Sequence, residues 1–102
     1  MNDDRITLPA GAHLHDRIAG ELLQTKSLAA MIWLIDAGRE LEFTVNNRTY
    51  YLSRSGSQKY VSLWQAEAEQ SFDSMEQLLA HAILDGKSFL DRWDNAQLNT
   101  LF

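Results

Sequence analysis

The sequence predicts an α+β fold, in which an antiparallel meander of three to four strands has helices packed on one face. Three observations predict this class: apolar residues at helical spacing near the start, apolar–polar alternation in the middle, and a capped amphipathic helix towards the end. The predicted order is two helices, three strands, a short fourth strand and two helices. A length of 102 residues suits one domain. We predict it over 13–102, after a flexible lead-in over 1–12 that contains Pro9.

The first two predicted helices span 13–24 and 28–35. Thr25 or Ser27 can cap the second helix, and Gly38 can end it. The apolar residues at helical spacing in the first helix are Leu14, Ile18, Leu22 and Leu23. The inner stripe of the second helix consists of Leu28, Met31, Ile32 and Ile35.

The second helix is apolar nearly all round, because Trp33 and Leu34 fall outside its inner stripe. Either the first helix covers this outer side or a second copy of the chain does. The second alternative predicts a homodimer whose contact consists of Met31, Trp33 and Leu34.

A β-hairpin is predicted around Asn46-Asn47, because asparagine tolerates the left-handed backbone that a two-residue type I′ turn requires. Apolar and polar residues alternate on both sides of this turn, as in a half-buried strand. Counting outward from the turn predicts three pairs: Val45 with Arg48, Phe43 with Tyr50, and Leu41 with Leu52. The apolar residues then share one face of the sheet.

Two further strands are predicted after the hairpin. The third covers 59–65, with Tyr60, Ser62 and Trp64 on one face. A polar connection over 66–69 leads to a short fourth strand that includes Phe72.

The C-terminal elements are predicted from their caps. A helix over 75–83 begins after the N-cap Ser74, and Asp85-Gly86 ends it. Ser88 can cap a short final helix, and the apolar tail over 97–102 can dock as an edge strand.

The outer face of the predicted sheet carries aromatic side chains beside carboxylates. The candidate partner-binding face consists of Glu42, Tyr51, Tyr60 and Trp64. Exposed tyrosine and tryptophan beside carboxylates are typical of protein-binding surfaces. In the alternative interpretation, Tyr60 and Trp64 pack under the N-terminal helix or a second chain.

No motif predicts catalysis, a cofactor or a metal. His13-x-His15-Asp16 offers ligand types that suit zinc or nickel, but histidines two positions apart point to different sides of a helix. Asp85-Gly86-Lys87-Ser88 lacks the first glycine of a phosphate-binding loop, because His81 occupies that position. The sequence therefore assigns no catalytic, cofactor-binding or metal-binding residue, and it favours a protein that is not an enzyme.

Charge and composition predict the compartment and the class of partner. A net charge of −5 disfavours nucleic acid and mildly favours a basic protein partner. The chain has no cysteine, which favours a reducing compartment. The longest apolar run, Leu28 to Ile35, is too short to cross a bilayer. We expect a cytoplasmic protein without a membrane contact.

Between Gly38 and its end, the chain contains a set of short sequence motifs. They are Gly38-Arg39-Glu40-Leu41-Glu42-Phe43, Tyr50, Phe72-Asp73-Ser74, Asp85-Gly86-Lys87-Ser88, Trp93 and Leu101-Phe102. With these segments the chain resembles a set of short uncharacterised proteins of Gram-positive bacteria and their mobile elements. The resemblance implies a compact α+β domain, but no activity and no site residue. The extension over 1–26 is atypical of that set.

The favoured hypothesis is a small acidic protein-interaction or accessory module that is not an enzyme and could form a homodimer. The alternative is a small ligand-binding domain or enzyme that uses a histidine, either His81 or the pair His13 and His15, with nearby carboxylates. A nucleic-acid binder is a third hypothesis, suggested only by a likeness of the element order to α-β-β-β-α RNA-binding domains.

Overall fold

The computed structural model describes residues 10–54 and 60–102. The chain divides into two compact units, Met1–Leu34 and Ile35–Phe102, which are described separately. The single domain expected over 13–102 therefore stays a prediction. In the part of the chain that the structure describes, the helices are too short or too polar to cross a bilayer.

Two helices account for the first unit: α1 (Ala10–Thr25) and α2 (Leu28–Asp36), whose last residues belong to the second unit. Helix α1 begins at Ala10, so the C-terminal end of the expected lead-in over 1–12 is helical, and the rest of that lead-in lies outside the described residues. The cap of α2 is Ser27, whose hydroxyl oxygen accepts from the backbone N–H of Ala30 at 3.1 Å.

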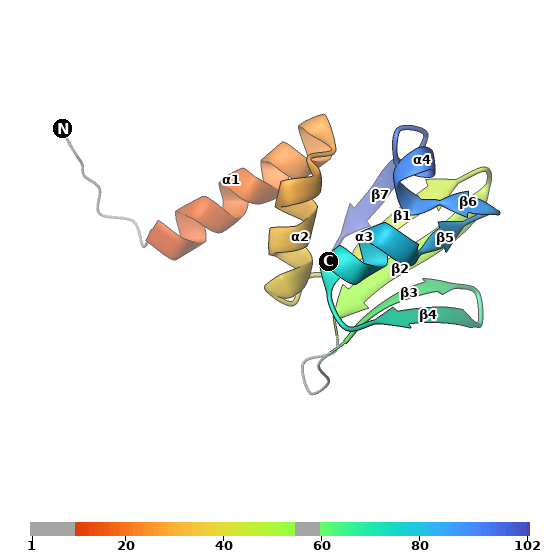
Figure 1. Cartoon of the computed structure of the whole chain (residues 1–102). Helices are drawn as coiled ribbons and strands as arrows, with labels where there is room; N and C mark the ends of the chain where they lie inside the picture. The colour runs from red at the N-terminus through yellow and green to blue at the C-terminus, as the bar shows by residue number, and fades with distance from the viewer. Residues whose placement is uncertain (1–9, 55–59) are drawn as a thin grey trace. The chain divides into compact units, whose positions relative to one another are not determined.

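The second unit is built on a five-stranded antiparallel sheet with the order β4-β3-β2-β1-β7 (Figure 1). Its strands are β1 (Leu41–Val45), β2 (Arg48–Arg54), β3 (Val61–Gln65), β4 (Ala68–Phe72) and β7 (Gln97–Leu101). The first four strands form the predicted meander, and the tail docks beside β1 as the predicted edge strand. The α+β class is confirmed.

The hairpin register is also confirmed. Asn46 and Asn47 have φ values of 51° and 65°, so both occupy the left-handed region that the type I′ turn requires. The pairs are those counted from the sequence: Val45 with Arg48, Phe43 with Tyr50, and Leu41 with Leu52. This register places every large apolar side chain of β1 on one face.

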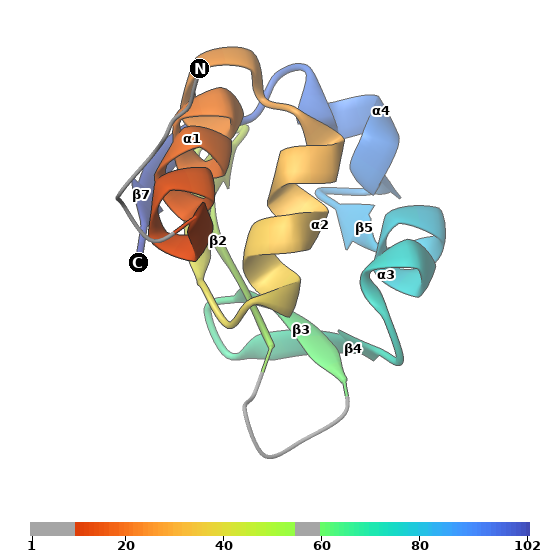
Figure 2. The ribbon, with the colours of Figure 1, turned by 90° about the vertical axis from the view of Figure 1, so that its left-hand side faces the viewer.

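That apolar face is the core of the second unit. Its buried residues from the sheet are Leu41, Phe43, Val45, Tyr50, Leu52, Val61 and Leu63. The ring of Phe43 lies 6.0 Å from Phe89 and 5.7 Å from Trp93, centroid to centroid, and both belong to α4 (Phe89–Trp93). Helix α3 (Met75–His81) contributes the buried Met75 and Leu78. Helices α3 and α4 lie on the same side of the sheet (Figure 2); the predicted contribution of α2 to this layer stays a prediction.

Two predicted boundaries are wrong, each because of a two-residue turn. The helix expected over 75–83 ends at His81, and a hairpin of β5 (Ile83–Leu84) and β6 (Lys87–Ser88) follows. Asp85 and Gly86, with φ values of 48° and 84°, form its turn rather than a helix end. Ile83, expected on the inner stripe, is therefore 46% exposed.

The polar connection expected over 66–69 is also too long. Only Ala66 and Glu67 separate β3 from β4, and Ala66 has a φ of 55°. Strand β4 accordingly begins at Ala68 and pairs with β3 along its whole length. At the other end, β3 begins at Val61 rather than 59.

Asp85, in the turn of the β5–β6 hairpin, is bonded to the turn of the β1–β2 hairpin. The side-chain amide of Asn46 donates to its carboxylate at 2.9 Å, and Nε of Arg48 lies 3.1 Å from the other carboxylate oxygen. The amide of Asn46 is the main cause that lowers the pKa of Asp85 below its ordinary value of 3.8; Arg48 and Arg92 act in the same direction and desolvation opposes them.

We expect this link to make part of the stability depend on pH. A lowered pKa in the folded state means that the unfolded chain binds the proton more readily, so the contribution of Asp85 is present above about pH 3.8 and is lost as the pH falls through the folded pKa. The free energies of unfolding of the wild type and of Asp85→Asn, measured in urea from pH 7 to pH 2.5, should therefore converge on acidification. A difference that stays constant over this range would contradict the account.

Candidate interaction face on the sheet

Four residues form a continuous row across the sheet, on the face opposite α3 and α4. Glu42 of β1 pairs with Tyr51 of β2, Tyr51 pairs with Trp64 of β3, and Trp64 pairs with Glu69 of β4. We call this set the acidic–aromatic row. Residues directly opposite each other in neighbouring strands have Cβ atoms about 4.5–5.5 Å apart. The two aromatic side chains are therefore adjacent, with one carboxylate on each side.

The row points away from the core because side chains alternate between the two faces of a strand. Leu41 and Phe43, on either side of Glu42, are fully buried, whereas Glu42 itself is half-buried. The tyrosine ring of the row is the most open of its large side chains, since Tyr51 is 43% exposed. Trp64 is half-buried and Glu69 is exposed. The row thus presents aromatic surface that the core of the second unit does not use.

Serine hydroxyl groups hold one carboxylate of the row, and an asparagine amide lies beside the other. Ser62 and Ser71 both donate to Oε2 of Glu69, at 2.6 and 2.9 Å. At the other end, the side-chain amide of Asn99 donates to the Thr44 hydroxyl at 2.8 Å and lies 3.5 Å from Oε2 of Glu42. The two hydroxyl groups hold the Glu69 carboxylate through Oε2.

The structure brings together three of the four residues predicted for the partner-binding face. Glu42, Tyr51 and Trp64 share the row, and Tyr60 lies one residue before β3, half-buried and outside the paired segment. Glu69 was not predicted, because the sequence analysis assigned it to a polar connection. Glu69 alternates with Ala68, Gln70 and Phe72, as residues of a strand do. This pattern predicts a strand only if the preceding turn is taken to be Ala66-Glu67 alone.

The residues of the predicted dimer contact differ in exposure. Met31 and Leu34 are fully buried, whereas Trp33 is 39% exposed. The ring of Trp33 meets that of His15 edge-on, with centroids 5.2 Å apart, so α1 and α2 contact each other at this point. Of the three predicted residues, Trp33 is the one that offers surface to another chain.

The histidines do not form a metal site with their neighbours. Among residues 10–54 and 60–102, no group of three or more histidine, aspartate or glutamate side chains converges closely enough to hold a metal ion. His81 is exposed at the last turn of α3, and Ser74 and Ser88 act as helix N-caps, each accepting from a backbone N–H. The serines and histidine of this region are thus in structural roles or in solvent.

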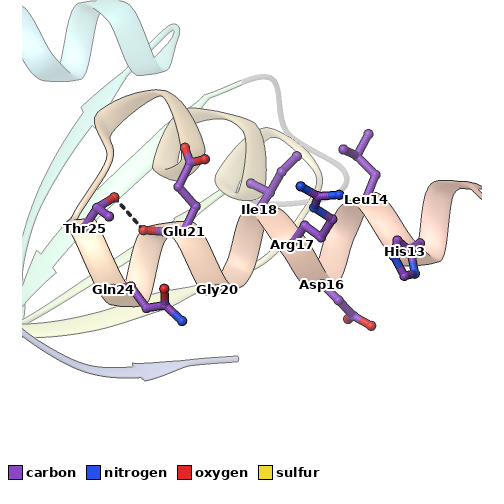
Figure 3. Close-up of a pocket in the computed structure, with 9 residues that line it drawn as sticks. All are labelled: His13, Leu14, Asp16, Arg17, Ile18, Gly20, Glu21, Gln24 and Thr25. Atoms are coloured by element: carbon purple, nitrogen blue, oxygen red, sulfur yellow. Dashed lines mark hydrogen bonds between the residues drawn. The ribbon is translucent and has the colours of Figure 1, made fainter.

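The hollows on the described surface include one along α1 and one beside the sheet. The larger follows α1, and its lining residues, from His13 to Thr25, all belong to that helix, so among the described residues it has no second wall (Figure 3). The smaller, of about 140 Å³, lies between Arg48, Tyr50, Gln70 and Asp85. Asp85 and Gln70 are already bonded there, Gln70 to both backbone groups of Ile83 at 2.8 and 2.9 Å.

Comparisons of the chain with protein-family models, with curated proteins and with solved structures found no match. Membership in the set of small Gram-positive proteins therefore stays a prediction from the sequence.

Proposed function

We propose that this chain is a small non-enzymatic protein-interaction module that binds a basic protein partner through the acidic–aromatic row. The observation that carries the proposal is the cross-strand adjacency of Tyr51 and Trp64 between Glu42 and Glu69. A lysine or arginine side chain gains a cation–π contact over a tyrosine or tryptophan ring and a charge-assisted bond to a carboxylate. The row supplies both kinds of contact on neighbouring strands, because the rings of Tyr51 and Trp64 lie between the carboxylates of Glu42 and Glu69.

The net charge of the chain supports the same class of partner. At −5, the chain attracts a basic partner over several ångströms before contact and accelerates the encounter. We also propose that the module is cytoplasmic. The chain has no cysteine, so the fold does not depend on disulfides and needs no oxidising environment. A homodimer through the Trp33 side of α2 remains a separate proposal, for which light scattering is the direct test.

Site-specific photocrosslinking tests the proposed function. A benzoylphenylalanine at position 51 replaces the exposed ring of the row, and the same residue at position 90 is the matched control, because Leu90 is 48% exposed on α4. We expect a partner that crosslinks from position 51 and not from position 90. The purified partner should then bind the wild type and lose affinity for Tyr51→Ala. Equal crosslinking from both positions would contradict the proposal.

A further inference from the structure

Strand β4 forms one edge of the sheet, and no strand of the described residues pairs with its outer side. Among the described residues, β4 pairs with β3 alone and lies at the edge of the order β4-β3-β2-β1-β7 (Figure 1). The two-residue turn makes Gln65 and Ala68 a hydrogen-bonded pair, and hydrogen-bonded pairs alternate along an antiparallel ladder. The backbone N–H and C=O groups of Glu69 and Ser71 therefore point away from β3. They form a ready template for another strand.

Of the features with which proteins usually protect a sheet edge, β4 has a charged side chain, Glu69. Other such features are proline, lysine and a β-bulge that twists the strand away. The sequence Ala-Glu-Gln-Ser-Phe contains neither proline nor lysine, and its register with β3 is regular throughout. The opposite edge, β7, does carry an irregularity, where its register with β1 shifts between Glu42 and Phe43. Of the two edges, β4 is the one suited to strand addition.

The chain segment that contains β4 is acidic, although Arg48 of β2 lines a hollow together with Ala68 and Gln70. From Val61 to Ala80 the chain contains no lysine or arginine, and its charged residues there are Glu67, Glu69, Asp73 and Glu76. A second copy would bring the same carboxylates against these, so self-pairing is opposed by like charge. An extended segment with alternating basic residues would instead complement the edge.

We infer that the partner of this module contributes an extended basic segment, which adds to β4 as a further strand. The inference rests on the proposed function and specifies how the partner binds. Backbone bonds to Glu69 and Ser71 hold the added strand, and alternate side chains of that strand lie on the face of the row. One basic side chain then lies next to Glu69, within reach of the Trp64 ring.

The test uses a capped peptide of about eight residues in which lysine and valine alternate, followed by amide chemical shifts of the full-length chain. A second peptide has the same sequence but N-methylated amides along the edge that would face β4, so it keeps the charge and loses the donors. A third peptide replaces lysine by glutamate. The protein variants are Ser71→Pro, which removes an outward N–H, and Ser71→Ala, which removes only the hydroxyl.

We expect saturable shifts in Ala68–Phe72 with the lysine peptide and a loss of about tenfold or more in affinity on N-methylation. Both Ser71 variants lose the hydroxyl bond to Glu69, so the affinity of Ser71→Pro should be about tenfold or more below that of Ser71→Ala. The glutamate peptide should not bind. Lysine-peptide binding at Tyr51 and Trp64 that ignores N-methylation would overturn strand addition while leaving the proposed function intact. Absence of any shift with the lysine peptide would overturn strand addition by basic segments; the crosslinking from position 51 then decides the proposed function by itself.

Discussion

Replacement of Phe43 by alanine should lower the free energy of unfolding by about 3–5 kcal/mol. Phe43 is fully buried and its ring contacts three others, those of Tyr50, Phe89 and Trp93, at centroid distances of 5.6, 6.0 and 5.7 Å. Truncation removes the ring and leaves a cavity between the sheet and α4. Urea unfolding followed by far-UV circular dichroism measures the loss. A loss of this size is a large fraction of the free energy of unfolding of a small domain.

The matched control is Tyr51→Ala, which removes an aromatic ring from the other face of the same hairpin. Because Tyr51 is 43% exposed, its truncation should cost about 1 kcal/mol or less. Similar losses for the two variants would contradict the assignment of the two faces of the sheet.

Trp64→Ala should weaken binding of the basic partner by about 2 kcal/mol or more, roughly thirtyfold in the dissociation constant. The physical reason is that Trp64 lies between Tyr51 and Glu69 in the row, where its ring can contact a basic side chain that the carboxylate also holds. Isothermal titration with the partner captured by crosslinking measures the effect.

Two further variants separate binding from folding. Trp64→Phe keeps an aromatic ring and should retain most of the affinity, whereas Leu90→Ala removes an exposed side chain from α4 and should change nothing. The thermal midpoint of each variant shows that it is folded before binding is compared. Full affinity in a folded Trp64→Ala would exclude the row as the binding surface.

The central hairpin could be predicted from the sequence because two local signals agreed. Asparagine at both turn positions allows positive φ, and the alternation on either side allows only one register that buries Leu41, Phe43 and Val45 together. The same register places Glu42 and Tyr51 on the outer face of the sheet. Two of the four predicted face residues follow from it.

The wrong boundaries arose where the turn residues gave a weak or ambiguous signal. Ala66 has a φ of 55°, which alanine rarely adopts, so nothing in its sequence indicates a tight turn. Asp85-Gly86 can end a helix or close a hairpin; the choice depends on contacts that residue spacing does not contain, such as the bonds from Asn46 to Asp85 and from Gln70 to Ile83. Glu69 was missed for the first reason and Ile83 was placed in the helix for the second.

The acidic–aromatic row depends on the register of four strands, and one measurement tests that register directly. Glu42 with Tyr51, and Trp64 with Glu69, are non-hydrogen-bonded pairs, whose Cα atoms lie only about 4.5 Å apart. A nuclear Overhauser spectrum should therefore show strong contacts between the Hα protons of both pairs. Contacts from Hα of Glu42 to Tyr50 and from Hα of Trp64 to Ala68 would instead mean a one-residue slip, which turns Tyr51 and Glu69 away from their neighbours and removes the row.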